Sequence, residues 1–183
     1  MTEIFIDFQG FYASSGFIFK ELAIIFNDNV SEPKHVVFKE PYEFSNLHSR
    51  DRVTAKWVTK NYHGLEWTGG DTPYDRLTEI LTQSIGAAGI VIVKGLSKER
   101  ILSQFTSNKT FILNLEEYGC VNFRKLLSMR SDMCDLHSDK SHICALQNAN
   151  NMSRWYNEHH GVRTVPEQGS ELDDGYDTCG CFC

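Results

Sequence analysis

The stretch Ile4-Phe-Ile-Asp-Phe-Gln-Gly10 predicts a β-strand, because its side chains alternate and apolar residues lie on both of the resulting faces. A turn at Ser14-Ser-Gly16 separates it from a second apolar run, which predicts a strand at about residues 17–26. Glu32-Pro33 leads into a third, shorter strand at residues 35–38. Since short links join these three strands, they should pair as an antiparallel meander.

The spacing of apolar residues then changes from two to nearly four, which indicates helices. The first helix should begin at Ser49, which can cap it, and should end at Gly64. A second helix should begin at Thr72-Pro73, where both residues suit the first turn. The apolar face of the first helix comprises Val53, Trp57, Val58 and Tyr62, and that of the second comprises Leu77, Ile80, Leu81 and Ile85.

Two further strands alternate with helices in the second half of the chain. The β-branched run at residues 89–94 predicts a buried parallel strand, and residues 110–115 predict another. Helices are expected from Ser97 to Phe105, at residues 122–129 and at residues 141–156. The meander is therefore followed by helices and strands in the order α-β-α-β-α.

This order of elements predicts an α/β protein with an RNase H-like fold. Right-handed crossovers place the fourth and fifth strands beside the first, which gives a mixed five-stranded sheet of three antiparallel strands followed by two parallel ones. Helices should cover both faces of that sheet. We expect one domain over residues 1–159, followed by a disordered tail over residues 160–183 that is acidic and contains glycine and cysteine.

The net charge of the chain is −6, and much of it lies in the last residues. Residues 160–183 contain Arg163 and five acidic residues, namely Glu167, Glu171, Asp173, Asp174 and Asp177. Charge alone therefore gives no sign of nucleic-acid binding. No apolar run approaches the roughly 18 residues of a membrane span, and we see no export signal, so we expect an intracellular protein, cytoplasmic or nuclear, without a membrane partner. There the six cysteines would serve as thiols or metal ligands rather than form disulfides.

Residues 133–146, M-C-D-L-H-S-D-K-S-H-I-C-A-L, contain the candidate metal ligands. Cysteine thiolate and histidine imidazole are preferred zinc ligands, and a short turn can place Cys134 and His137 on one ion. Cys144 would join them from the first turn of the last helix, where the helix dipole favours a thiolate. The alternative is that both cysteines are small buried apolar residues and His137 lies on the surface. Three ligands do not close a structural zinc site, so a fourth must come from elsewhere.

Several segments resemble the DnaQ-type 3′–5′ exonuclease branch of the RNase H-like fold. Residues 4–10 resemble its first strand, which carries a D-x-E motif, and Lys20-Glu-Leu-Ala-Ile-Ile25 resembles its second strand. Val91-Ile-Val-Lys-Gly95 lies where the segment with the second acidic cluster would begin. Cys144-Ala-Leu-Gln-Asn148 is similar to the helix that supplies the last aspartate. The resemblance covers about residues 1–158 through short motifs.

A closer resemblance is to the Maelstrom domain, a relative of these exonucleases in which an E-C-H-C zinc constellation replaces the usual carboxylates. Carried over residue by residue, the resemblance implies a structural zinc held by Glu21, Cys134, His137 and Cys144, although the interval between the two cysteines is shorter than in the family. It also implies binding of single-stranded RNA in small-RNA or transposon silencing, with an unusual RNA-cleaving activity left open. The alternative is a catalytically inactive nuclease fold that serves as a protein-interaction module, with its acidic tail on a basic partner.

The carboxylates that a two-metal exonuclease needs are incomplete in this sequence. Asp7 remains, but Gln9 and Asn148 stand at positions where acids are expected. Glu99 is a candidate acid of the second motif, or a partner of its own helix dipole. Because an amide binds Mg²⁺ poorly and adds no charge, we expect no two-metal exonuclease activity.

Three basic residues are candidates for RNA binding. Lys94, Lys98 and Arg100 cluster near the expected carboxyl edge of the fourth strand, where they could contact phosphates. The alternative is that they form an ordinary solvated charged face.

Overall fold

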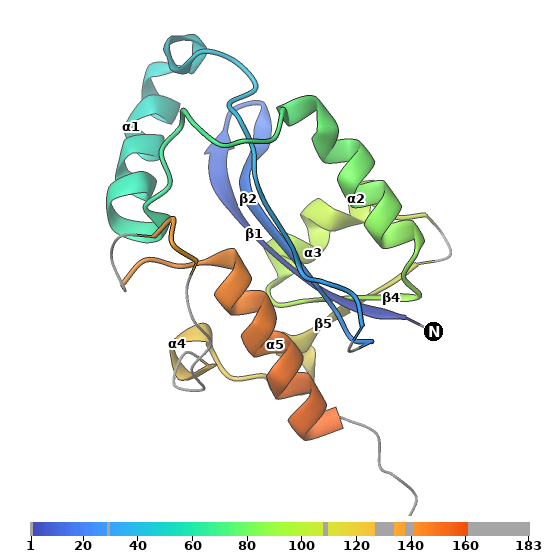
Figure 1. Ribbon diagram of the computed structural model, residues 1–183. Coiled ribbons are helices and arrows are strands. Elements are labelled where there is room, and N and C mark those ends of the chain that lie inside the picture. Colours follow the sequence, from blue (N-terminus) through green and yellow to red (C-terminus); the bar gives the residue numbers. More distant parts are fainter. Residues whose placement is uncertain (1, 29, 108–109, 127–133, 138–140, 161–183) are drawn as a thin grey trace, which may run out of the picture.

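A computed structural model describes residues 2–28, 30–107, 110–126, 134–137 and 141–160 of the chain. Its centre is a five-stranded sheet in the order β3-β2-β1-β4-β5 (Figure 1). The strands are β1 (Glu3–Ala13), β2 (Gly16–Phe26), β3 (Lys34–Val37), β4 (Ile90–Val93) and β5 (Phe111–Asn114). β1, β2 and β3 pair antiparallel, whereas β4 pairs parallel with β1 and β5 parallel with β4. The predicted fold class, a mixed RNase H-like sheet, is confirmed.

The long β1–β2 hairpin is bent by a change of register between Gln9 and Gly10. Glycine is required at this bend, because a Cβ atom on Gly10 would lie 2.0 Å from the Ile18 carbonyl oxygen. The bend separates the part of the hairpin in the central sheet from the part that extends beyond it, towards α1 (Ser49–Val58). Asp7 and Gln9 lie directly before this bend.

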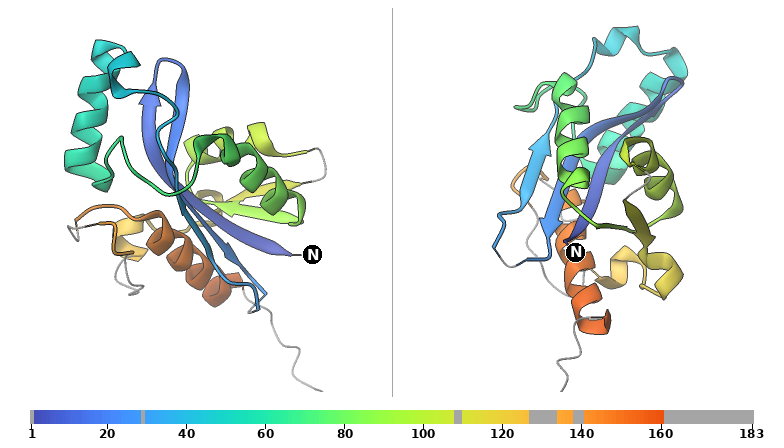
Figure 2. Two further views of the ribbon diagram at one scale, coloured as in Figure 1. Left: turned by 45° about the horizontal axis from the view of Figure 1, so that its top comes forward. Right: turned by 90° about the vertical axis from the view of Figure 1, so that its right-hand side faces the viewer.

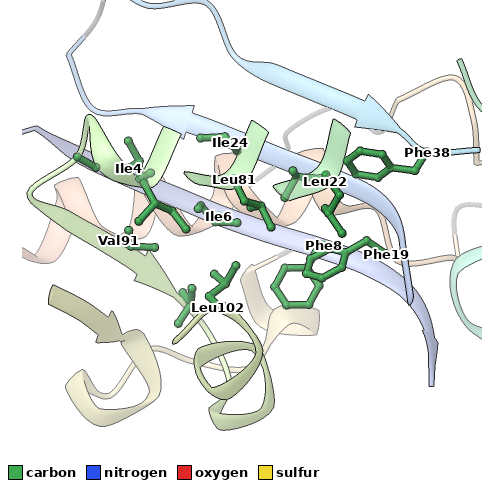
Figure 3. Close-up of a cluster of buried hydrophobic side chains, with 14 residues drawn as sticks. Ile4, Ile6, Phe8, Phe19, Leu22, Ile24, Phe38, Leu81, Val91 and Leu102 are labelled. Carbon is green, nitrogen blue, oxygen red and sulfur yellow. The ribbon is translucent and has the colours of Figure 1, made fainter. Parts of the chain in front are cut away.

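Helices cover both faces of the sheet, as the sequence predicts (Figure 2). On one face, α2 (Leu77–Gly86) and α3 (Leu96–Leu102) pack on side chains such as Ile4, Ile6 and Phe8 (Figure 3). On the other face, α4 (Phe123–Leu126) and α5 (Ala145–His160) pack on Phe5, Ala23 and Ile25. Residues 127–129 of the predicted fourth helix and residues 161–183 of the predicted tail lie outside the described residues. In the part of the chain that the structure describes, no helix has the length and apolar character to span a membrane.

Most of the apolar face predicted for the first helix is exposed. Val53, Trp57 and Tyr62 are 69%, 59% and 43% exposed. The helix packs on the far end of the hairpin through Ala55, which is buried, and Val58, which is partly buried. A π-helical turn, Thr59–His63, then extends it to Gly64, whose φ of 73° gives the expected left-handed end. Spacing alone identified an apolar stripe, but it did not establish that anything covers it.

Candidate metal centre

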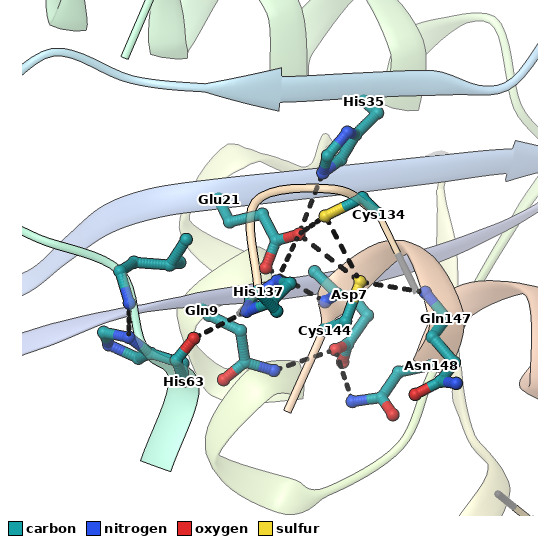
Figure 4. Close-up of polar contacts among 12 residues, drawn as sticks. Asp7, Gln9, Glu21, His35, His63, Cys134, His137, Cys144, Gln147 and Asn148 are labelled. Atoms are coloured by element: carbon teal, nitrogen blue, oxygen red, sulfur yellow. Dashed lines mark hydrogen bonds and ion pairs between the residues drawn. The ribbon is translucent and has the colours of Figure 1, made fainter. Parts of the chain in front are cut away.

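The four predicted metal ligands come together on the α5 side of the sheet (Figure 4). Glu21 projects from β2 beneath the start of α5, and Cys144 lies directly before that helix. Cys134 and His137 come from a turn in which the His137 amide donates to the Cys134 carbonyl at 3.4 Å. One ligand atom from each residue lies within 4.8 Å of the other three. Segments more than a hundred positions apart in sequence thus meet at one point.

The separations of the ligand atoms are those expected around a single small ion. The sulfur atoms of Cys134 and Cys144 are 3.6 Å apart. Glu21 Oε1 lies 3.6 Å from Cys134 Sγ and 3.7 Å from Cys144 Sγ, and His137 Nε2 lies 3.3 Å from the same oxygen. Glu21 and His137 have fully buried side chains, and Cys144 is 0% exposed. Cys134 is partly exposed, so the cluster is largely shielded from solvent, and it can bind a metal ion.

The start of α5 stabilises negative charge at this site. The backbone amide of Ala145 donates to Glu21 Oε2 at 3.0 Å, and that of Gln147 donates to Cys144 Sγ at 3.5 Å. Cys144 thus occupies the capping position, one residue before the first turn in which the sequence placed it, and the helix dipole favours its thiolate. A hydrogen bond from Cys134, together with one from His137, lowers the pKa of Cys144 to about 5 although burial opposes this. The same hydrogen bond between the two sulfur atoms raises the pKa of Cys134, which keeps the proton.

His137 is held by a backbone group that sequence reasoning missed. Its Nδ1 donates to the His63 carbonyl oxygen at 2.6 Å, which leaves Nε2 facing Glu21. Such a bond fixes the tautomer and the orientation of a metal-binding imidazole. Burial disfavours the charged ring, but hydrogen bonds to Cys144 and Glu21 raise the pKa of His137 to about 10.

His35 is a second neighbour of the cluster that the sequence did not reveal. Its Nε2 lies 2.8 Å from Glu21 Oε1, and its side chain is 21% exposed. Burial alone would raise the pKa of Glu21, yet hydrogen bonds from His137, His35 and the Ala145 amide lower it to about 2. Glu21 is consequently a carboxylate at neutral pH, ready to act as a ligand. No local sequence signal links His35 to Glu21, since strand pairing brings them together.

Asp7, which the resemblance to exonucleases singled out, lies beside the four-residue cluster on the same face of the sheet. Asp7 Oδ2 accepts hydrogen bonds from Gln9 Nε2 at 3.1 Å and from Asn148 Nδ2 at 3.0 Å. The structure therefore brings together Asp7 and the two amides that stand at expected acid positions. Glu99 does not join them, because it accepts a hydrogen bond from Asn114 Nδ2 at 3.1 Å.

A lysine ammonium provides the positive charge at this position. Lys98 Nζ bonds to Asp7 Oδ1, and it also lies 5.3 Å from the centre of the Phe8 ring. Asp7 is 0% exposed, and burial raises the pKa of its carboxyl group while Lys98 and Asn148 act in the opposite direction. The site thus holds one carboxylate, two amide donors and an internal cation, in place of several carboxylates around metal ions.

The three basic residues predicted to bind RNA do not share one surface. Lys94 is 5% exposed and contacts the Glu116 carboxylate at 3.2 Å and the Cys120 carbonyl oxygen at 3.4 Å. Lys98 bonds to Asp7, so Arg100 is the exposed member of the set. A phosphate at the protein surface would reach Arg100 but not Lys94.

The site has two parts, a four-residue cluster that can bind a metal ion and the buried Asp7–Lys98 pair beside it. Both parts depend on the contact between the β1–β2 hairpin and the start of α5. No protein-family model and no curated protein matches this chain.

Proposed function

We propose that this chain is a zinc-stabilised RNase H-like domain of the Maelstrom type that binds single-stranded RNA and has no two-metal exonuclease activity. The observation that carries the proposal is the cluster of Glu21, Cys134, His137 and Cys144, whose ligand atoms lie within 4.8 Å of one another. The proposal extends to a role in small-RNA or transposon silencing, which the E-C-H-C pattern implies through the resemblance.

Ligand chemistry and spacing both favour zinc. Around tetrahedral zinc, bond lengths of about 2.3 Å to sulfur and about 2.0–2.1 Å to nitrogen or oxygen put two sulfur ligands about 3.8 Å apart and other pairs about 3.3–3.6 Å apart. The observed separations of 3.6 Å between the sulfur atoms and 3.3 Å between His137 Nε2 and Glu21 Oε1 agree with this cage. Thiolates are poor ligands for Mg²⁺ and Ca²⁺.

A structural role fits the coordination. Four protein ligands close a zinc site and leave no open position for a substrate or a water molecule. The ion would join β2 to the start of α5 and to the turn that holds Cys134 and His137. Structural zinc contributes to folding free energy, because the unfolded chain has no preformed site.

The Asp7–Lys98 pair supports the absence of exonuclease chemistry. Two-metal catalysis uses two divalent ions about 3.5–4 Å apart, held by several carboxylates. Here Asp7 bonds to an ammonium group and to the Gln9 and Asn148 amides. A divalent ion would have to displace Lys98 and would gain only a single carboxylate.

The metal proposal is tested by replacing the ion with Co²⁺. Cobalt bound tetrahedrally by two thiolates gives strong visible and charge-transfer bands, and a titration should reach its end point at one ion per chain. The metal site would be contradicted if the absorbance did not rise as Co²⁺ is added, or if the bands persisted in the Cys144→Ala variant.

The RNA proposal is tested by measuring the affinity for a fluorescently labelled oligouridylate over a range of salt concentrations. Binding that weakens steeply with salt is expected, because phosphate contacts release counterions. The alternative function, a protein-interaction module, is favoured by the exposed apolar residues Val53 and Trp57 on α1. Absence of RNA binding at low salt would support that alternative.

A further inference from the structure

The outer surface of α1 combines positive charge with exposed aromatic rings. We call it the α1 face, and its exposed residues are Arg50, Val53, Lys56, Trp57, Lys60 and Tyr62. The helix and the π turn after it contain four basic residues, Arg50, Arg52, Lys56 and Lys60, against one acidic residue, Asp51, whereas the whole chain has a net charge of −6. Asp51 is itself occupied, because it accepts hydrogen bonds from the backbone and side chain of Ser14.

The cations of the α1 face lie in a row beside its apolar residues. Val53 and Trp57 lie one helical turn apart, and so do Lys56 and Lys60, so the two pairs form neighbouring rows. Lys56 Nζ also lies 5.9 Å from the centre of the Phe44 ring. Lys56 and Lys60 line a second cavity, beside Phe44 and Trp67, so a strand with one base on Trp57 would reach them with its flanking phosphates rather than with that base.

An aromatic cavity of about 280 Å³ opens beside Trp57. Its walls include five aromatic side chains, namely Phe8, Tyr12, Phe17, Trp57 and Tyr62. Tyr12 is 57% exposed and Tyr62 is 43% exposed, so these two rings are accessible from solvent. The cavity is slightly smaller than the roughly 300–1,000 Å³ of sites that enclose drug-sized ligands, so it suits a single planar ring system. Lys98, 5.3 Å from the Phe8 ring, already places a cation here, which disfavours a quaternary ammonium ligand.

We propose that the α1 face binds single-stranded nucleic acid, with one base stacked on Trp57 at the aromatic cavity and the flanking phosphates on Lys56 and Lys60. This inference rests on the proposed function and assigns its RNA to the α1 face rather than to the set of Lys94, Lys98 and Arg100, although Lys98 also lines the aromatic cavity. Aromatic stacking together with a basic track is how proteins bind single strands without reading their sequence. The row of two lysines beside Trp57 favours this ligand over an apolar protein surface, which would have to bury both lysines.

Trp57 is a built-in reporter for this interaction. It is 59% exposed, whereas Trp67 and Trp155 are 6% and 5% exposed. The chain has three tryptophans, so a base that stacks on the α1 face should quench the exposed share of the emission. The probes are a twelve-residue oligouridylate, an oligothymidylate of the same length, an abasic oligonucleotide of the same length and polyglutamate. We expect quenching by the first two only, because the others carry charge without bases.

Matched substitutions separate this surface from the rest of the molecule. Trp57→Ala should weaken binding to oligouridylate by about 5- to 150-fold, the range for loss of one stacked base. Trp57→Phe should keep most of the affinity and lose the quenching. Phe111→Ala removes a ring that is 60% exposed on β5 and should leave affinity within about twofold. The Lys56→Ala/Lys60→Ala variant should reduce the salt slope of log K by about 1.4, whereas Arg100→Ala should leave it unchanged.

The outcomes are distinguishable. RNA binding without Trp57 quenching, and with equal affinity in Trp57→Ala, overturns the α1 face while the proposed function stands. Equal quenching by polyglutamate or by the abasic strand also overturns it, because the ligand would then be any acidic polymer. Absence of binding to either oligonucleotide at low salt refutes the proposed function itself.

Discussion

Replacement of Lys98 by methionine should destabilise the domain strongly, because it removes the cation from a buried carboxylate. Asp7 is fully buried and the Lys98 side chain is only 17% exposed, and loss of one partner of such a pair costs about 3–5 kcal/mol. Asp7 would keep its hydrogen bonds to Gln9 and Asn148, and burial already raises the pKa of its carboxyl group, so protonation can relieve part of the cost. We therefore expect a loss of about 3 kcal/mol near pH 8 and a melting temperature lower by about 6–12 °C.

The assay is urea unfolding of four proteins, the unmodified chain, Lys98→Met, Asp7→Asn and the double variant. Removal of both charges should cost less than the sum of the single changes, with a coupling energy of about 2 kcal/mol. The folded-state pKa of Asp7 lies above its unfolded value of 3.8, so ionisation of this group destabilises the fold as pH rises. Without Lys98 this destabilisation by the ionised Asp7 is larger. The loss of unfolding free energy in Lys98→Met should therefore shrink as pH falls from 8 towards 5.

The matched control is Lys39→Met at an exposed lysine, which should change stability by no more than about 0.5 kcal/mol. Additive single changes, or a Lys98→Met variant as stable as this control, would refute the role assigned to the pair.

Three further predictions concern the metal and the chemistry. Cys144→Ala should lose the metal and much of the fold, since structural zinc contributes on the order of 10 kcal/mol to folding. The control is Cys120→Ala, at a buried cysteine outside the cluster, which should retain one zinc per chain in elemental analysis. Acidification should weaken zinc binding, because protons compete for both thiolates, and a chelator competition assay that finds equal affinity at pH 5.5 and 7.5 would contradict this. No Mg²⁺- or Mn²⁺-dependent shortening of single-stranded RNA or DNA from the 3′ end is expected, and shortening that Asp7→Ala abolishes would show that a nuclease centre survives.

Local patterns were sufficient to predict the sheet. Alternation over residues 4–9, turn residues at 14–16 and the β-branched run near residue 91 specify strands whose pairing follows from short links and right-handed crossovers. The spacing in residues 134–144 likewise identified three of the four residues of the candidate metal cluster within one segment. Glu21 was identified only through the family resemblance, since more than a hundred residues separate it from Cys134 and no periodic pattern connects them.

Contacts between distant segments account for what the sequence did not show. Lys98 is separated from Asp7 by 91 positions, so a residue expected to bind phosphate instead pairs with a buried carboxylate. His35 and the His63 carbonyl reach the cluster through strand pairing and the path of the π turn, which residue types do not encode locally. Spacing placed the apolar residues of α1 on one face but could not show what covers it. Ala55 is buried and Val58 partly buried, whereas Val53 and Trp57 are exposed, because the helix packs on the end of the hairpin rather than on the sheet.

The most direct test of the central claim is the metal content of the purified chain, expressed without an affinity tag and measured by elemental mass spectrometry. We expect one zinc per chain, retained through dialysis against a weak chelator and lost in Cys134→Ala and His137→Ala. A well-folded, unmodified chain that contains no zinc would contradict the assignment of Glu21, Cys134, His137 and Cys144 as a structural zinc site.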